Sequence, residues 1–138
     1  MARQARAKHE QRSEDTALQA AKTAALAGLE KKGEEVTILD VRGLASYTDF
    51  LVLMSATSDR QVNAIADAVD EVLRKAGHRP IGVEGLGSGN WILIDSGDVV
   101  VHVFQQQARE FYDLDSLWAD AKRVHVDERP SVSAVVRG

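Results

Sequence analysis

The chain of 138 residues contains no cysteine. This absence excludes disulfides, thiolate zinc sites, iron–sulfur clusters and cysteine nucleophiles, and it agrees with a reducing compartment. Long apolar runs are absent too: the longest are about six residues, whereas a membrane span needs about 20. We therefore expect a soluble, cytoplasmic protein without a signal peptide, long enough to form one domain with its own core.

Charge is unevenly distributed along the chain. The sequence has 17 Lys and Arg against 21 Asp and Glu, a formal net charge of −4. Residues 1–12 hold four bases and one acid, a charge of +3, which leaves 13 bases and 20 acids, a charge of −7, on residues 13–138. An acidic body is poorly suited to a phosphate backbone, because each neutralised phosphate requires a Lys or Arg. A basic protein surface is the better partner.

The two ends of the chain differ from its middle. After Met1, residues 1–12 have alanine as their only apolar member, so we predict a disordered basic arm there. Residues 125–138 contain Pro130 and show no periodic pattern, which indicates a flexible tail. The folded domain is therefore expected over residues 13–124.

Helical and strand patterns alternate within this domain. An alanine-rich helix is predicted from Ser13 or Thr16 to about residue 32, ending at Gly33. A capping box over residues 58–61 starts a second helix, and a third covers about residues 106–121, either continuous or broken near Asp113. Apolar runs predict strands at residues 36–41, 50–54, 81–84, 91–95 and 99–104, the last two as a hairpin. The order α-β-β-α-β-β-β-α predicts an α+β or mixed α/β fold with a sheet of about five strands flanked by helices.

Three features invite a catalytic interpretation, and each has a plainer one. The glycine-rich loop at residues 85–89 has neither a following Lys nor a following helix, which favours a flexible connection over a phosphate site. Asp40 and Asp49 lie on successive strands without the Asp-x-Asp pair of a two-metal site, so Asp49 is expected to tie a turn. His102 is the only histidine inside a predicted element, and we expect a hydrogen-bonded packing residue rather than a base. None of the four histidines shows metal-ligand spacing.

Aromatic and acidic residues gather in the last third of the chain. Five of the seven aromatic residues lie beyond residue 90, and residues 84–120 contain seven acids against one base, Arg109. We expect Phe104 and Phe111 to fill the core, whereas Trp91, at a strand start after a glycine-rich loop, could be buried or exposed. Exposed aromatic side chains are typical of protein interaction sites because they bury a large area with few rotors to freeze.

Several longer motifs follow one another along the chain. They are Leu39-Asp40-Val41, Thr48-Asp49-Phe50, Ser58-Asp59-Arg60-Gln61-Val62 with Ile65-Ala66-Asp67, Glu84-Gly85 with Trp91, residues 95–103, and residues 109–118. In order and spacing, over about residues 16–124, they resemble the ribosomal silencing factor family, the Iojap-like proteins. Asp115 is a conservative departure, because many relatives carry Glu there.

The resemblance implies a fold and a function. The fold would be a five-stranded mixed sheet flanked by helices, related to nucleotidyltransferases but without their catalytic acids. The protein would be no enzyme and would need no cofactor or metal. It would bind the large ribosomal subunit through a basic ribosomal protein of the intersubunit face, block joining of the small subunit and lower translation when nutrients are scarce. It would form a homodimer when free, and its N-terminal arm could make a minor rRNA contact.

The resemblance also implies site residues. Trp91 matches the aromatic residue at the ribosome contact, and we extend this prediction to Asp95, His102, Arg109 and Tyr112. Two other classes stay open: a nucleotidyltransferase-like enzyme or nucleotide sensor that uses Asp40 and Asp49, and a plain dimerisation module.

Overall fold

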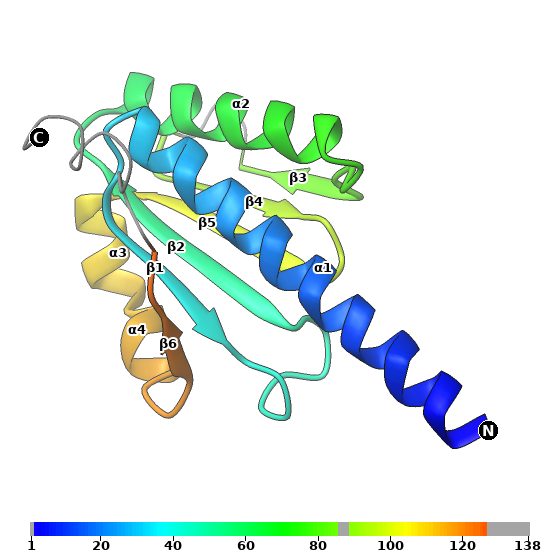
Figure 1. Cartoon of the computed structure of the whole chain (residues 1–138). Coiled ribbons are helices and arrows are strands. Elements are labelled where there is room, and N and C mark those ends of the chain that lie inside the picture. The colour runs from blue at the N-terminus through cyan, green and yellow to red at the C-terminus, as the bar shows by residue number, and fades with distance from the viewer. Residues whose placement is uncertain (1, 86–88, 127–138) are drawn as a thin grey trace, which may run out of the picture.

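Helices and strands alternate along the chain as the sequence predicts (Figure 1). The computed structural model describes residues 2–85 and 89–126, and for residues 2–15 only the backbone. The helices are α1 (Ala2–Glu30), α2 (Asp59–Lys75), α3 (Gln106–Tyr112) and α4 (Leu114–Leu117). The strands are β1 (Glu34–Asp40), β2 (Phe50–Ala56), β3 (Gly82–Glu84), β4 (Trp91–Asp95), β5 (Val99–Gln105) and β6 (Lys122–Val124). The predicted α+β fold is confirmed.

One mixed sheet joins the described strands in the order β3-β4-β5-β2-β1-β6. β2 and β5 are parallel, and the other neighbours are antiparallel. Every residue of the central strand β2 is buried, as its continuous apolar run predicts. β4 and β5 form the predicted hairpin.

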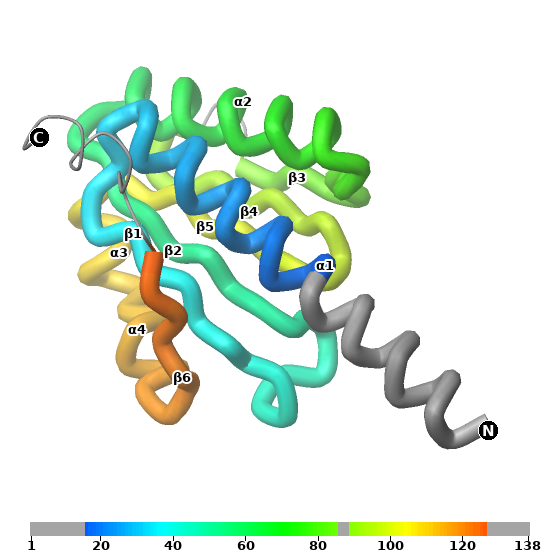
Figure 2. The backbone as a smooth tube through the Cα atoms, viewed as in Figure 1, coloured from blue at the N-terminus to red at the C-terminus, as the bar shows by residue number. Residues whose placement is uncertain are grey.

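The sequence predicted about five strands, and the sixth is β6, which lies beside β1 (Figure 2). Its three residues are too few for a period-2 pattern, so the sequence signal was absent. β6 falls at the predicted end of the folded domain. Of the predicted tail over residues 125–138, only the first two residues are described.

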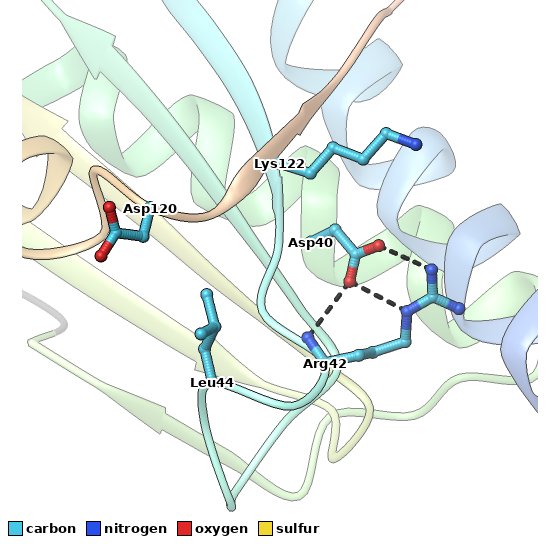
Figure 3. Close-up of a pocket in the computed structure, with 5 residues that line it drawn as sticks. All are labelled: Asp40, Arg42, Leu44, Asp120 and Lys122. Carbon is cyan, nitrogen blue, oxygen red and sulfur yellow. Dashed lines mark hydrogen bonds and ion pairs between the residues drawn. The ribbon is translucent and has the colours of Figure 1, made fainter.

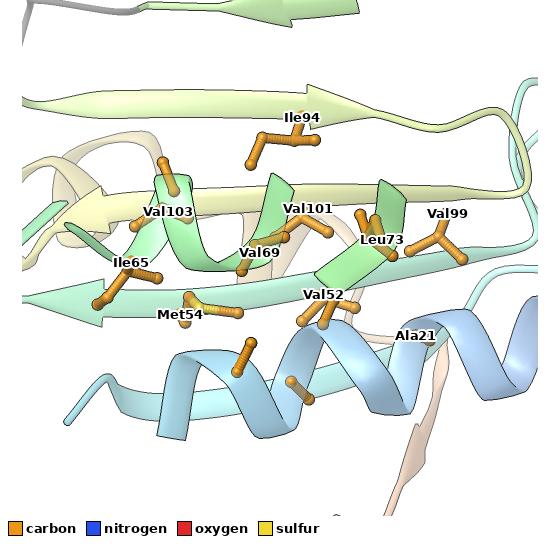
Figure 4. Close-up of a cluster of buried hydrophobic side chains, with 14 of the residues drawn as sticks. Ala21, Val52, Met54, Ile65, Val69, Leu73, Ile94, Val99, Val101 and Val103 are labelled. Carbon is orange, nitrogen blue, oxygen red and sulfur yellow. The ribbon is translucent and has the colours of Figure 1, made fainter. Parts of the chain in front are cut away.

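The side chains of successive strand residues point to opposite faces of the sheet. On β5, Val99, Val101 and Val103 face one way, toward α1 and α2. We call this side the helical face. Between the helix and the sheet, α2 buries Val62, Ile65, Ala66, Val69 and Leu73 (Figure 4).

The part of α1 whose side chains are described buries only small residues against this face. They are Ala17, Ala20, Ala21, Ala24, Ala25 and Ala27. At Gly28 a Cβ atom would overlap the sulfur of Met54 on β2. Small side chains therefore let α1 lie close to the sheet.

The opposite side of the sheet carries a second apolar cluster. Its buried members are Leu39, Val41, Leu51, Leu53, Val100, Phe104 and Ala121. The partly buried Trp91, Leu93, Ala108, Leu114 and Trp118 pack against them from β4, α3 and the segment around α4. We call this side the aromatic face. Burial of Phe104 confirms its predicted place in the core.

The ends of α1 differ from the sequence prediction. The helix begins at Ala2, where the sequence predicted a disordered arm over residues 1–12 and a start at Ser13 or Thr16. Residues 2–27 contain neither Gly nor Pro and are rich in Ala, Arg, Gln and Glu, which extend an existing helix at little cost. At the other end Lys32, not Gly33, takes the left-handed conformation, with φ of 65°. Gly33 instead donates its N–H to the carbonyl of Gly28.

The start of α2 follows its predicted capping box in part. Ser58 Oγ accepts from the backbone N–H of Gln61 at 3.2 Å. The Gln61 side chain, however, accepts from the backbone N–H of Thr57 at 2.8 Å rather than from Ser58. Its amide also donates to the carbonyl of Lys32 at 2.9 Å, so that one side chain joins the end of α1 to the start of α2. Gly77 follows the end of this helix with φ of 87°, the left-handed conformation that glycine adopts at helix ends.

Candidate protein-contact surface

Trp91 begins β4 and lies on the aromatic face. The ring centroids of Trp91 and Phe104, its cross-strand partner on β5, are 4.9 Å apart. The ring of Tyr112, at the end of α3, lies 4.6 Å from that of Trp91. Trp91 Nε1 donates a hydrogen bond to Nδ1 of His102 at 3.0 Å. Trp91 is therefore half-buried, with one edge of the indole fixed by a polar partner.

His102, the acceptor of that hydrogen bond, is a buried residue. It is 6% exposed, and its ring lies parallel to that of Phe104 at 5.8 Å. Burial lowers the pKa of His102 to about 4. Because Nδ1 accepts from the indole, the neutral ring carries its proton on Nε2. The sequence prediction of a hydrogen-bonded packing residue is confirmed.

The loop before β4 is held close to the Trp91 backbone. Gly85 has φ of 89°, and a Cβ atom at this position would collide with the Trp91 carbonyl oxygen. Glycine is the residue that tolerates both conditions. Just before Trp91, the Asn90 carbonyl accepts a hydrogen bond at 2.8 Å from the backbone N–H of Gln105 on β5. Residues 86–88 of the predicted glycine-rich loop lie outside the described residues.

The side chain of Arg109 connects α3 to the sheet through hydrogen bonds. Its guanidinium is 6% exposed and donates at 2.6 Å to the Glu35 carbonyl and at 3.1 Å to Ser55 Oγ. Glu35 has φ of 49° and lies where the register of β1 shifts, which turns its carbonyl toward the arginine. A longer bond of 3.4 Å reaches Thr37 Oγ1. Two further hydrogen bonds of the guanidinium, at 3.0 and 3.1 Å, go to the two carboxylate oxygens of Asp115 and form a bidentate ion pair.

This pair links α3 to α4. The hydrogen bond from Arg109 holds the pKa of Asp115 below its ordinary value. Between the two helices, Asp113 takes the left-handed conformation with φ of 49°. The third helix predicted from the sequence is therefore broken near Asp113, which is one of the two alternatives that the sequence left open. All five N–H groups of Arg109 are therefore engaged inside the molecule.

The outer end of α3 presents two aromatic side chains to solvent. Phe111 is 80% exposed and Tyr112 is 51% exposed. The predicted core position of Phe111 was therefore wrong. Three residues after Ala108, Phe111 fits the periodicity of a buried face, but α3 ends one residue later and no further turn of the helix covers the ring. A groove of about 560 Å³ runs between β4 and α3, lined by Asn90, Trp91, Gln107, Ala108, Phe111 and Tyr112.

The five residues predicted for the contact are not all adjacent. Trp91, His102 and Tyr112 form one ring cluster, and Arg109 anchors the helix that carries Tyr112. Asp95 lies four residues from Trp91 at the other end of β4, about 13 Å along the strand. There its carboxylate accepts from the backbone N–H of Gly97 at 2.8 Å and shapes the turn into β5. The set predicted from the sequence did not include Phe111, which lines the groove, or Ser55, which accepts a hydrogen bond from Arg109. Ser55 lies within an apolar strand and gave no signal in the sequence.

The two acids of the enzyme alternative lie elsewhere. Asp40 forms a bidentate pair with Arg42 at 2.6 and 2.9 Å, in a shallow cleft that Lys122 and Asp120 also line (Figure 3). The hydrogen bond from Arg42 lowers the pKa of Asp40. The Asp49 backbone donates to the Asp98 carbonyl and accepts from the Val41 N–H, both at 3.0 Å, which ties the turn as predicted. Within the described residues, no group of three His, Asp or Glu could hold a metal ion.

The architecture and this surface define a class of protein. It is an α+β domain with a mixed sheet that presents exposed aromatic side chains on one face, and aromatic residues are enriched at protein–protein interfaces. Over the described part of the chain, no helix has the length and apolar character to cross a bilayer.

Comparison with known proteins gives the family. The family described as "Ribosomal silencing factor during starvation" matches residues 14–137. A Haemophilus influenzae protein named Ribosomal silencing factor RsfS is 43% identical over 88 residues, 64% of this chain and 86% of that protein. Its Bacillus subtilis namesake is 37% identical over 106 residues, 77% of this chain and 90% of that protein. A crystal structure of a Chromobacterium violaceum protein superposes with a TM-score of 0.72 at 38% identity, covering 74% of this chain and 85% of that one. The chain belongs to the ribosomal silencing factor family, whose name describes a ribosome-associated role in regulating translation.

Proposed function

We propose that this chain binds the large ribosomal subunit through a basic ribosomal protein of the intersubunit face and blocks joining of the small subunit. The effect would be lower translation under nutrient limitation. Trp91 and Tyr112 would make direct contact, whereas the buried His102 and Arg109 would position them. Asp95 would act at a separate point, at the far end of β4.

The single observation that carries this proposal is the ring cluster of Trp91. Its indole is held on one edge by His102, packed on Phe104 and Tyr112, and open toward a groove. A half-buried aromatic side chain that is already fixed loses little entropy on binding, which is the character of an interface anchor. The acids of residues 84–120 and the −7 charge of residues 13–138 favour a basic partner.

Three further properties belong to the same proposal. The protein acts in the cytoplasm as a steric block rather than as an enzyme, and needs no cofactor. It forms a homodimer when free. The basic residues 1–12 add a minor contact to rRNA, because their charge of +3 can displace counterions from phosphates.

Cosedimentation with purified large subunits tests the proposal. We expect the wild-type chain to enter the large-subunit peak and Trp91→Ala to lose about 2 to 4 kcal/mol of binding free energy, roughly 30- to 1,000-fold in affinity. Tyr47→Ala is the matched control, because Tyr47 is an exposed aromatic residue on the β1–β2 connection, outside the ring cluster. Failure of the wild-type chain to cosediment would refute the proposal.

A second measurement separates contact from folding. Thermal unfolding of Trp91→Ala should remain cooperative, since Trp91 is only half-buried. An affinity loss no larger than the loss of folding free energy would remove Trp91 from the contact.

A further inference from the structure

Phe111 is the most exposed aromatic side chain among the described residues, at 80%. It lies in the last turn of α3 and meets Tyr112 edge to face, with ring centroids 5.1 Å apart. Tyr112 in turn lies 4.6 Å from Trp91. The rings thus form a row that begins in the core at Phe104 and ends in solvent at Phe111.

The row is held in place before any partner arrives. Arg109, two residues before Phe111, fixes α3 to β1 and β2 through bonds of 2.6 and 3.1 Å. The helix has only seven residues, so this anchor lies within one turn of Phe111. Binding here would remove apolar area from water without first ordering the helix.

The charged residues on either side of the aromatic pair are acids, and Arg123 of β6 lines a neighbouring cleft together with Glu110 and Asp113. Glu110 and Asp113 are exposed on either side of the aromatic pair. Arg109 is the only base between residues 84 and 120, and it is buried and paired with Asp115. A partner at this end of the groove therefore meets apolar rings between carboxylates.

We infer that Phe111 is a second anchor of the contact surface, and that the groove between Trp91 and Phe111 takes an apolar side chain flanked by Lys or Arg from a basic protein. This inference rests on the proposed function, because it names the chemistry of the segment seated at the same surface. It adds a residue outside the predicted contact set. It also predicts that the carboxylates contribute mainly to the association rate.

Affinity for purified large subunits, measured at several salt concentrations, tests the inference. We expect Phe111→Ala to bind at least about 10-fold more weakly than the wild-type chain. Leu117→Ala is the matched control, because Leu117 is 70% exposed on α4 and does not line the groove; its affinity should change less than about 2-fold. Glu110→Gln should reduce the salt dependence of the association rate.

The outcomes separate the inference from the proposed function. If the wild-type chain does not bind the subunit, the proposed function fails and the inference fails with it. If Trp91→Ala weakens binding and Phe111→Ala does not, the inference alone is overturned. Sedimentation velocity of the free protein tests whether a second copy of the chain occupies the groove. If Phe111→Ala loses self-association but binds the subunit normally, the groove belongs to a second copy and the inference is overturned.

Discussion

The two faces of the sheet are built from different chemistry. The helical face is covered by α1 and α2, and its core is apolar throughout, with alanines and glycine giving close helix–sheet contact. The aromatic face is covered only in part by α3 and α4. It buries three polar side chains, Ser55, His102 and Arg109, and leaves Phe111 and Tyr112 in solvent.

This difference separates stability from recognition. Apolar packing is non-directional, so the helical face contributes free energy of folding without fixing the orientation of any one group. Hydrogen bonds are directional, and the buried polar groups of the aromatic face orient two specific features, the indole of Trp91 and the helix α3. Substitutions on the helical face should therefore change the free energy of unfolding alone. Substitutions on the aromatic face should change the affinity for the large subunit as well.

The largest expected effect is that of Arg109→Met. Removing the guanidinium leaves the Glu35 carbonyl, Ser55 and Asp115 without their donor, and we expect a loss of about 3 to 5 kcal/mol in the free energy of unfolding. Subunit affinity should fall as well, because α3 loses its anchor. Urea denaturation measures the first effect and cosedimentation the second.

The control for this substitution is Arg74→Met on α2. Arg74 pairs with Asp70 at 2.9 Å on an exposed helix surface, so its loss should cost less than about 0.5 kcal/mol. If Arg109→Met were equally mild, the aromatic face would not depend on a polar anchor.

A cavity on the helical face should have an effect on stability alone. Leu73 is fully buried under α2, so Leu73→Ala should lower the free energy of unfolding by about 3 kcal/mol. Measured in conditions where the variant is folded, its affinity for the large subunit should equal that of the wild-type chain. A matching loss of affinity would show that the two faces are not independent.

An effect that depends on pH belongs to His102. The unfolded chain has the ordinary pKa of 6.5 and takes up a proton before the folded chain, whose pKa is about 4. The free energy of unfolding should therefore fall as pH falls from about 6.5 to about 4, by about 3 kcal/mol in total at the lower end.

His102→Phe removes this titration while keeping a ring beside Phe104, so the pH dependence of urea unfolding over that window should flatten. His78→Gln, a histidine outside the core, is the control and should leave the dependence in place. A slope unchanged in His102→Phe would contradict a buried neutral histidine.

Much of the fold could be predicted from the sequence, because its signals are local. The period of α2, its capping serine and Gly77 define that helix, and a continuous apolar run defines β4. Predictions failed where the signal was short or depended on distant contacts. β6 has three residues, and the conformation at Lys32 follows from a hydrogen bond between Gly33 and Gly28.

The candidate site was less predictable. Motif resemblance pointed to Trp91 and Tyr112, which the structure brings together. The exposure of Phe111 could not be predicted, because α3 ends before another turn could cover the ring. Nor could the sequence show that Arg109 points inward, since its partners Ser55 and Glu35 lie 54 and 74 residues away along the chain.

The central claim is that occupation of the large subunit by the aromatic face prevents subunit joining. Light scattering during mixing of small subunits with large subunits, after incubation with this protein, measures joining directly. We predict that the wild-type chain reduces the joined fraction in proportion to its occupancy of the large subunit. Trp91→Ala at the same concentration should leave joining unchanged. Normal joining by large subunits saturated with the wild-type chain would contradict the account.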